Sequence, residues 1–276
     1  MSKHDGSSAS SRKRVTALSL RKMKENGEKI ATLTCYDAAF ARLMEDSTID
    51  VVLVGDSLGN VMLGFDSTIP VTMDHMVHHT AAVARRIKHA FLVADMPFMS
   101  YNMSPEQALT NAARLLQEAG AHAVKLEGGE EIIPQIEALV HAGIPVMGHL
   151  GLTPQKIHSL GGFRVQGRGE QGDKLFAAAK RLEAAGICSL VLELVPKDLT
   201  RRVSEALQIP TIGIGAGPYA DGQVLVLHDL LGFDEGFRPK FLKTYANLHE
   251  TVTGAIRDYV HDVKSANYPT DEHSFD

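Results

Sequence analysis

The chain has 276 residues, of which 44% are hydrophobic and 22% charged, with a formal net charge of -5 and a pI near 6.2. This composition is ordinary for a globular protein, and its slight acidity argues against binding nucleic acid or an acidic membrane surface. No apolar run approaches the roughly 20 residues that span a bilayer. The length suits an α/β barrel, which can form one domain of about 250 residues.

The amino-terminal segment is rich in serine and lacks the apolar stretch of a secretory signal, which predicts a disordered tail over residues 1–14. Cys35 and Cys188, the only cysteines, each lie next to a predicted strand. We expect both to be buried thiols in a reducing compartment rather than a disulfide. These features predict a cytoplasmic protein with one domain over residues 15–276.

Strands and helices alternate along the whole chain. A helix is predicted first, at 18–26, and the predicted strands are 30–35, 51–54, 91–95, 123–127, 145–148, 189–194, 211–215 and 223–227. Further helices are predicted at 38–44, 72–89, 104–120, 130–142, 173–185, 198–207 and 241–263. Alternation with short connections predicts parallel pairing, and eight units favour a closed (βα)8 TIM barrel over an open sheet. Only the stretch 216–222 is too short to hold a full helix between two strands.

Two connections are longer than usual. The excursion at 60–71 is typical of a lid over a ligand, and a plain surface hairpin fits its sequence equally well. The glycine-rich loop at 159–172 is expected to be mobile or to face a ligand.

Four of the predicted strands lead directly into a carboxylate: Asp56, Asp95, Glu127 and Glu193. A single such acid is most often a turn former or a helix cap. In a parallel barrel, however, all the carboxyl ends of the strands open on one face, so the four acids are predicted to converge. Carboxylates at close quarters repel unless a cation or a proton intervenes, and hard oxygen ligands suit Mg2+ better than a structural Zn2+.

A series of segments resembles the ketopantoate hydroxymethyltransferase family in both order and spacing. These segments are 55–59, 66–72, 94–98, 124–129, 148–155, 166–168, 213–217 and 221–223, and the resemblance runs from about residue 16 to residue 275. It implies a barrel of the phosphoenolpyruvate and pyruvate superfamily. It also implies transfer of a hydroxymethyl group from 5,10-methylenetetrahydrofolate to 3-methyl-2-oxobutanoate, giving 2-dehydropantoate for pantothenate synthesis, in a homodecamer.

The resemblance implies a role for each convergent acid. Asp56 and Asp95 are implied as Mg2+ ligands, with Glu127 reaching the ion directly or through water, and Glu193 as the catalytic base. Proton loss from C3 of the substrate leaves an enolate, and a divalent ion chelated by the substrate oxygens stabilises its charge. Glu193 stands on a different strand from the metal ligands, which leaves it free to take the proton.

The resemblance further implies a substrate site made of Asp56, Ser57, Asp95, Lys125 and His149. Lys125 precedes Glu127 by two residues and shares its face of the strand, so it either neutralises the substrate carboxylate or only pairs with Glu127. His149 either donates to substrate or to the product hydroxyl, or packs and caps.

Two other functions fit the same residues. One is a Mg2+-dependent carbon-carbon lyase or mutase of the same superfamily that acts on another 2-oxo acid, and folate dependence discriminates it. The other is a non-catalytic barrel that serves as a binding or assembly component, which a Mg2+ titration discriminates.

Overall fold

A computed structural model describes residues 12–162, 164–234, 236 and 238–276. The described residues form two compact units, which divide after Val224. The single domain expected over 15–276 stays a prediction. Most of the expected tail lies outside the described residues. Within its described part, the Arg12 guanidinium donates to the carbonyl oxygens of Glu45 and Ile49.

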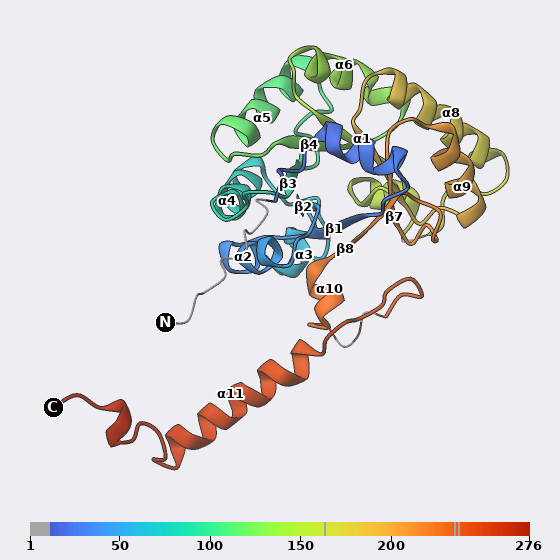
Figure 1. The fold of residues 1–276 in the computed structure, drawn as a ribbon. Coiled ribbons are helices and arrows are strands. Elements are labelled where there is room, and N and C mark those ends of the chain that lie inside the picture. The colour runs from blue at the N-terminus through green and yellow to red at the C-terminus, as the bar shows by residue number, and fades with distance from the viewer. Residues whose placement is uncertain (1–11, 163, 235, 237) are drawn as a thin grey trace, which may run out of the picture. The chain divides into compact units, whose positions relative to one another are not determined.

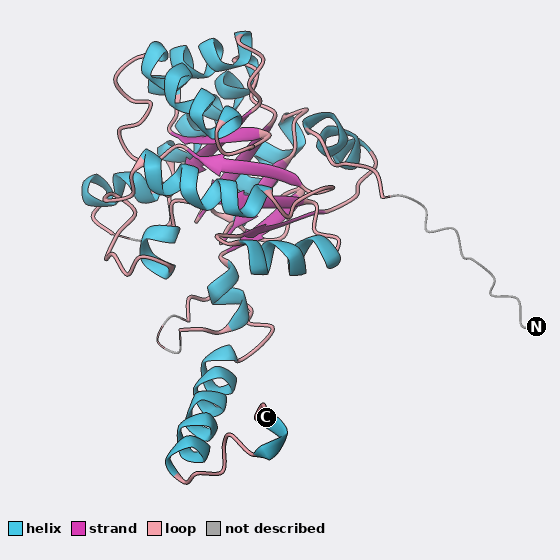
Figure 2. Ribbon diagram, turned by 90° about the vertical axis from the view of Figure 1, so that its left-hand side faces the viewer, coloured by secondary structure: helices cyan, strands magenta, loops and turns pink. Residues whose placement is uncertain are grey.

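The first unit is a closed barrel of eight parallel strands in chain order, enclosed by helices (Figures 1 and 2). The strands are β1 (Ile30–Thr34), β2 (Val51–Val54), β3 (Phe91–Asp95), β4 (Ala123–Glu127), β5 (Val146–Gly151), β6 (Ser189–Glu193), β7 (Thr211–Ile214) and β8 (Gly222–Leu225). This topology confirms the predicted (βα)8 barrel. As expected, no helix separates β7 from β8.

The predicted helices of this unit are present in order with shifted ends, the one at 130–142 is divided into η1 and α6, and the short elements α3, η2 and α7 were not predicted. They are α1 (Ala17–Glu25), α2 (Ala38–Asp46), α3 (Leu58–Val61), α4 (Met73–Ala84), α5 (Pro105–Gln117), η1 (Glu130–Ile132), α6 (Ile133–His141), η2 (Pro154–Lys156), α7 (Ile157–Leu160), α8 (Glu170–Ala184) and α9 (Lys197–Ala206). Side-chain caps explain several starts: the Thr72 hydroxyl accepts from the amide of His75 at α4, and Ser104 caps α5.

The barrel interior near the amino-terminal ends of the strands is apolar. Alternate residues of a strand point inward, so one side-chain layer draws on every strand. This layer is completed by Leu20 of α1 and consists otherwise of Ile30, Val51, Leu53, Phe91, Val93, Ala123, Met147, Val191, Ile212 and Val224. All of these side chains are buried, and they close the end of the barrel opposite the carboxylates.

The excursion at 60–71 contains no strand, so the hairpin alternative is wrong. The helix α3 enters it, and the irregular chain that follows is held by a bond from the Asn60 amide to the carbonyl oxygen of Phe65, at 2.9 Å. Movement of this segment as a lid stays a prediction.

The second unit contains α10 (Leu227–Leu231), α11 (Leu248–Lys264) and η3 (Asp271–His273). The helix predicted from 241 begins only at 248, because Asn247 caps it and Tyr245 donates its backbone N–H to the carbonyl of Leu230. Along α11 no residue is buried within the chain. Among the described helices, none has the length and apolarity to cross a membrane.

Candidate active site

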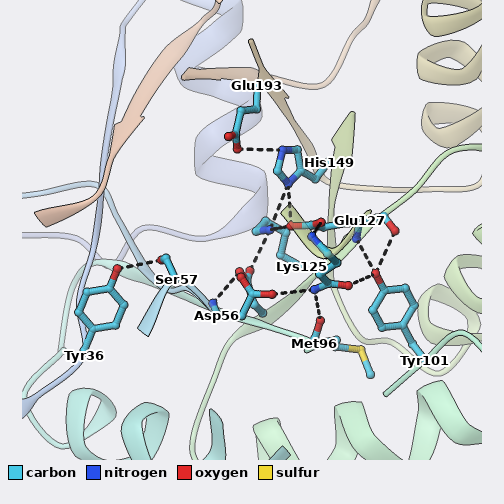
Figure 3. A network of polar contacts seen from close by, with 11 residues as sticks. Tyr36, Asp56, Ser57, Met96, Tyr101, Lys125, Glu127, His149 and Glu193 are labelled. Carbon is cyan, nitrogen blue, oxygen red and sulfur yellow. Dashed lines mark hydrogen bonds and ion pairs between the residues drawn. The ribbon is translucent and has the colours of Figure 1, made fainter. Parts of the chain in front are cut away.

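Three carboxylates from neighbouring strands meet inside the barrel. Asp56 lies two residues after the end of β2, Asp95 is the last residue of β3, and Glu127 is the last residue of β4. Each of the three side chains is at most 3% exposed. The backbone N–H of Asp56 donates to Oδ2 of Asp95 at 3.0 Å, which ties the first two strand ends together. The predicted convergence of these acids is therefore present (Figure 3).

Lys125 is the buried cation between these acids. Its Nζ lies 3.1 Å from Oδ1 of Asp95 and 3.6 Å from Oε1 of Glu127. It is therefore closer to Asp95 than to Glu127, the partner expected from their shared face of β4. Burial lowers the pKa of this ammonium, but the charges of Asp95 and Glu127 outweigh burial and raise it. Lys125 is thus a positive charge held at the carboxyl ends of β3 and β4.

His149 connects this cluster to the fourth acid. Its Nδ1 lies 3.3 Å from Oε1 of Glu127, and its Nε2 lies 3.4 Å from Oε2 of Glu193. Burial and the charge of Lys125 lower the pKa of His149, but the neighbouring carboxylates of Glu127 and Glu193 outweigh them and raise it to about 9. Glu193 keeps 15% of its side chain exposed, so it remains reachable at the edge of the buried group.

Gly151 allows the ends of β5 and β6 to approach closely. Its φ is +100°, and a Cβ there would lie 2.1 Å from the carbonyl oxygen of Glu193 and 2.8 Å from Cγ2 of Val195. The next residue, Leu152, donates its N–H to that same carbonyl at 2.8 Å. Only glycine fits this junction, and the junction fixes the backbone that carries Glu193.

Ser57 lies apart from the ion pairs. It is half-buried at the start of α3, and its hydroxyl is 2.9 Å from the hydroxyl of Tyr36. Among the described contacts, none joins the Ser57 side chain to the carboxylates or to Lys125. It lies at the mouth of the barrel, where a substrate group could reach it.

Three residues of the site were missed in the sequence: Tyr36, Tyr101 and Gln155. Tyr36 follows β1 just as Asp56 follows β2, so its position was a usable signal. Gln155 closes the segment 148–155 that carries the family resemblance, which was also a signal. Tyr101 lies in an irregular stretch after β3, and no local pattern distinguishes it.

The electrostatics of the acids fit a divalent cation. Burial, followed by repulsion from Asp95 and Glu127, raises the pKa of Asp56 well above its usual range. Burial also raises the pKa of Asp95, whose Oδ1 is buried and makes no hydrogen bond despite the nearby ammonium of Lys125. By contrast, burial raises the pKa of Glu127, but Lys125, His149 and the backbone N–H of Gln155 together outweigh burial and lower it. One lysine therefore does not balance the aspartates.

Within the described ranges, no group of three or more His, Cys, Asp or Glu side chains has the arrangement of a complete metal site. This does not exclude Mg2+, because Mg2+ is usually held by one or two protein carboxylates and takes its other ligands from substrate and water. Asp56 and Asp95 suit that pattern. Glu127 is engaged by His149 and by the backbone of Gln155, so contact through water is the role that its position favours.

A groove of about 360 Å³ lies between two loops at the carboxyl ends of the strands, and none of its lining residues is one of the four acids. It runs between the excursion after β2, from Ile69 to Met73, and the loop after β3, from Pro97 to Ser100. Both loops leave the carboxyl ends of the strands that carry Asp56 and Asp95.

The closed parallel barrel, with acids at the carboxyl ends of its strands, places the chain in the class of (βα)8 barrel proteins. Solved structures with this architecture include phosphonopyruvate hydrolase in complex with oxalate and Mg++ (TM-score 0.62, 13% identity, 95% of this chain and 92% of that one). Another is 2,3-dimethylmalate lyase, a member of the PEP mutase/isocitrate lyase superfamily (TM-score 0.59, 16% identity, coverage 94% and 91%). At these identities the likeness shows the fold alone.

Sequence comparison gives the family. The ketopantoate hydroxymethyltransferase model matches residues 14–271. The 3-methyl-2-oxobutanoate hydroxymethyltransferase of Thermoanaerobacter sp. (strain X514) is 57% identical over 95% of this chain and 96% of its own length. The enzyme of the same name from Syntrophus aciditrophicus (strain SB) is 52% identical, with 98% and 99% covered. The chain belongs to the ketopantoate hydroxymethyltransferase family, a family of transferases, which confirms the predicted resemblance.

Proposed function

We propose that this protein transfers a hydroxymethyl group from 5,10-methylenetetrahydrofolate to 3-methyl-2-oxobutanoate and forms 2-dehydropantoate. The observation that carries the proposal is the separation of charges in the site. A pair of aspartates faces Lys125 at one end, and Glu193 stands at the other, beyond His149. This arrangement keeps one carboxylate free for proton transfer, while Lys125 and a cation on the aspartates hold the negatively charged end of the substrate.

Each residue of the site has a role that follows from its position. Lys125 neutralises the substrate carboxylate, Ser57 donates to it from the mouth of the barrel, and Glu193 takes the proton from C3. His149 holds the carboxylate of Glu193 in place through Nε2. Asp56 and Asp95 would hold Mg2+, which when bound stabilises negative charge on the substrate oxygens.

The atoms of the reaction balance with one water. The C3 carbon, having lost its proton to Glu193, forms a bond to the methylene carbon of the folate, and the bonds from that carbon to nitrogen break. A water supplies the hydroxyl oxygen, and the folate leaves as tetrahydrofolate after its two nitrogens have taken up one proton from Glu193 and one from the water.

The test of the proposal is Glu193→Gln. Exchange of the C3 proton for deuterium, followed by NMR in D2O with Mg2+ and without folate, is expected to slow about 10²–10⁴-fold because a general base is lost. Mg2+ and substrate binding should persist. Glu205→Gln, at an exposed position of α9, is the matched control. Undiminished exchange in Glu193→Gln would remove Glu193 from the base role.

A carbon-carbon lyase or mutase acting on another 2-oxo acid is the second candidate, because the solved structures with this fold include enzymes named as lyases and mutases. Folate separates the two. Cleavage or rearrangement of a 2-oxo acid without folate, together with no 2-dehydropantoate when folate is present, would overturn the transferase proposal.

We also propose a cytoplasmic homo-oligomer, with a decamer as the expected size. Support comes from α11, where an apolar stripe is exposed in the single chain: Val252, Ile256, Tyr259, Val260 and Val263. Exposed apolar stripes of this kind mark contacts with other chains. Light scattering of the purified protein measures the subunit number.

A further inference from the structure

The side chain of Gln155 crosses the space between three strand ends. It is 4% exposed, and its Nε2 donates to Oδ2 of Asp56 and to the carbonyl oxygen of Met96, both at 2.9 Å. The backbone N–H of Gln155 donates to Oε2 of Glu127 at 3.1 Å. A single residue after β5 therefore contacts groups that follow β2, β3 and β4.

Tyr101 fixes the other end of this amide. Its hydroxyl can donate to Oε1 of Gln155 at 2.8 Å or to the carbonyl oxygen of Glu127 at 2.9 Å, and it accepts from the backbone N–H of Glu127 at 3.1 Å (Figure 3). If the Gln155 amide turned over, its oxygen would face two acceptors, the Asp56 carboxylate and the Met96 carbonyl, and its NH2 would face the hydroxyl. The contacts thus allow one orientation, in which the donors point at Asp56.

This orientation decides which aspartate oxygens are free. Gln155 occupies Oδ2 of Asp56, and no described residue donates to the other oxygen of that carboxylate. Asp95 differs in one respect: its Oδ2 accepts from the N–H of Asp56, and its Oδ1, which makes no hydrogen bond, lies 3.1 Å from the ammonium of Lys125. One oxygen of Asp56 is therefore left for a cation, whereas on Asp95 the cation would share Oδ1 with Lys125. Mg2+ is usually held by one or two such carboxylates.

We propose that Gln155 is a positioning residue that turns one oxygen of Asp56 toward the divalent cation, and that Tyr101 locks the amide in that role. The inference rests on the proposed function only in requiring a cation at the two aspartates. Partners of this kind, which orient a metal ligand without touching the metal, typically change metal affinity 10–100-fold when they are removed.

The experiment measures Mn2+ binding by electron paramagnetic resonance with Gln155→Met, which keeps the length of the side chain and removes both donors. We expect the dissociation constant for Mn2+ to rise about 10–100-fold. The control is Gln135→Met, which changes another buried glutamine, in α6 and outside the site, and should leave the constant unchanged. Tyr101→Phe keeps the ring and should weaken binding about fivefold, as expected for one lost hydrogen bond.

The outcomes separate the two proposals. If the unmodified protein binds Mn2+ and Gln155→Met binds it equally well, the positioning role is wrong while the proposed function stands. If the unmodified protein binds no Mn2+, both are overturned. If Gln155→Met does not fold, Tyr101→Phe decides: weaker Mn2+ binding supports the role, and unchanged binding contradicts it. A purely structural role would lower the melting temperature without moving the Mn2+ constant of the folded protein.

Discussion

At the amino-terminal ends of the strands the barrel interior is packed with apolar side chains, whereas two residues further along the same strands it holds ion pairs. Val93 of β3 lies in the apolar layer and Asp95 in the charged one; on β4, Ala123 and Lys125 repeat this step. Strand alternation points all of them inward. The same alternation of the backbone therefore supplies a stabilising apolar layer near the amino-terminal ends of the strands and a layer of reactive groups near their carboxyl ends.

The apolar layer is expected to be far less tolerant of charge. Val93→Asp would bury a carboxylate that has no partner, at a position with no exposed surface. We expect a loss of about 5 kcal/mol or more in the free energy of unfolding, enough to unfold the chain. Circular dichroism and urea denaturation measure it. The control Val165→Asp makes the same change at a position that is 41% exposed and should be nearly neutral. A folded, stable Val93→Asp protein would mean that the two layers do not differ as described.

The charged layer should depend on its single lysine. Lys125→Met leaves Asp95 and Glu127 buried without their shared partner, which typically costs about 3–5 kcal/mol. The matched control is Lys156→Met, because Lys156 pairs with Glu131 at an exposed site where less than about 1 kcal/mol is expected. Urea denaturation without divalent ions compares the two. Equal losses would contradict a special role for the buried ammonium.

The sequence predicted those features of the two layers that depend on neighbouring residues, and it missed those that depend on contacts between distant parts of the chain. The strands β2, β3 and β4 have the predicted ends, because short, mainly apolar runs that end at a glycine or a carboxylate are local patterns. The convergence of Asp56, Asp95 and Glu127 followed from barrel closure alone. Gln155 could not be assigned in this way, because its bond to Asp56 joins positions 99 residues apart.

The start of α11 was also missed. Helical spacing over 241–263 says nothing of the bond between Tyr245 and Leu230 that holds the preceding chain out of the helix. The start of this helix is set by a contact between residues distant in the sequence rather than by local helix propensity.

The smallest expected effect has the opposite sign and concerns Asp56 without metal. Burial and the charges of Asp95 and Glu127 raise its pKa in the folded protein, so the folded state holds this proton more tightly than the unfolded chain does. Stability without divalent ions should therefore fall as pH rises from the ordinary value of 3.8 through the raised pKa. Asp56→Asn keeps an acceptor for Gln155 and removes the repulsion. The free energy of unfolding of Asp56→Asn without divalent ions should therefore be higher than that of the unmodified protein at pH 7.

Asp56→Asn should also lose most of the rise in melting temperature that Mg2+ gives the unmodified protein, because a ligand stabilises only the state that binds it. Thermal unfolding from pH 4 to pH 8, with and without Mg2+, tests both halves, and Asp66→Asn in the exposed excursion is the control. A destabilised Asp56→Asn protein would show that the carboxylate is stabilising without any cation. In that case the charged layer would be held together by its internal pairs and would not depend on a metal for its balance.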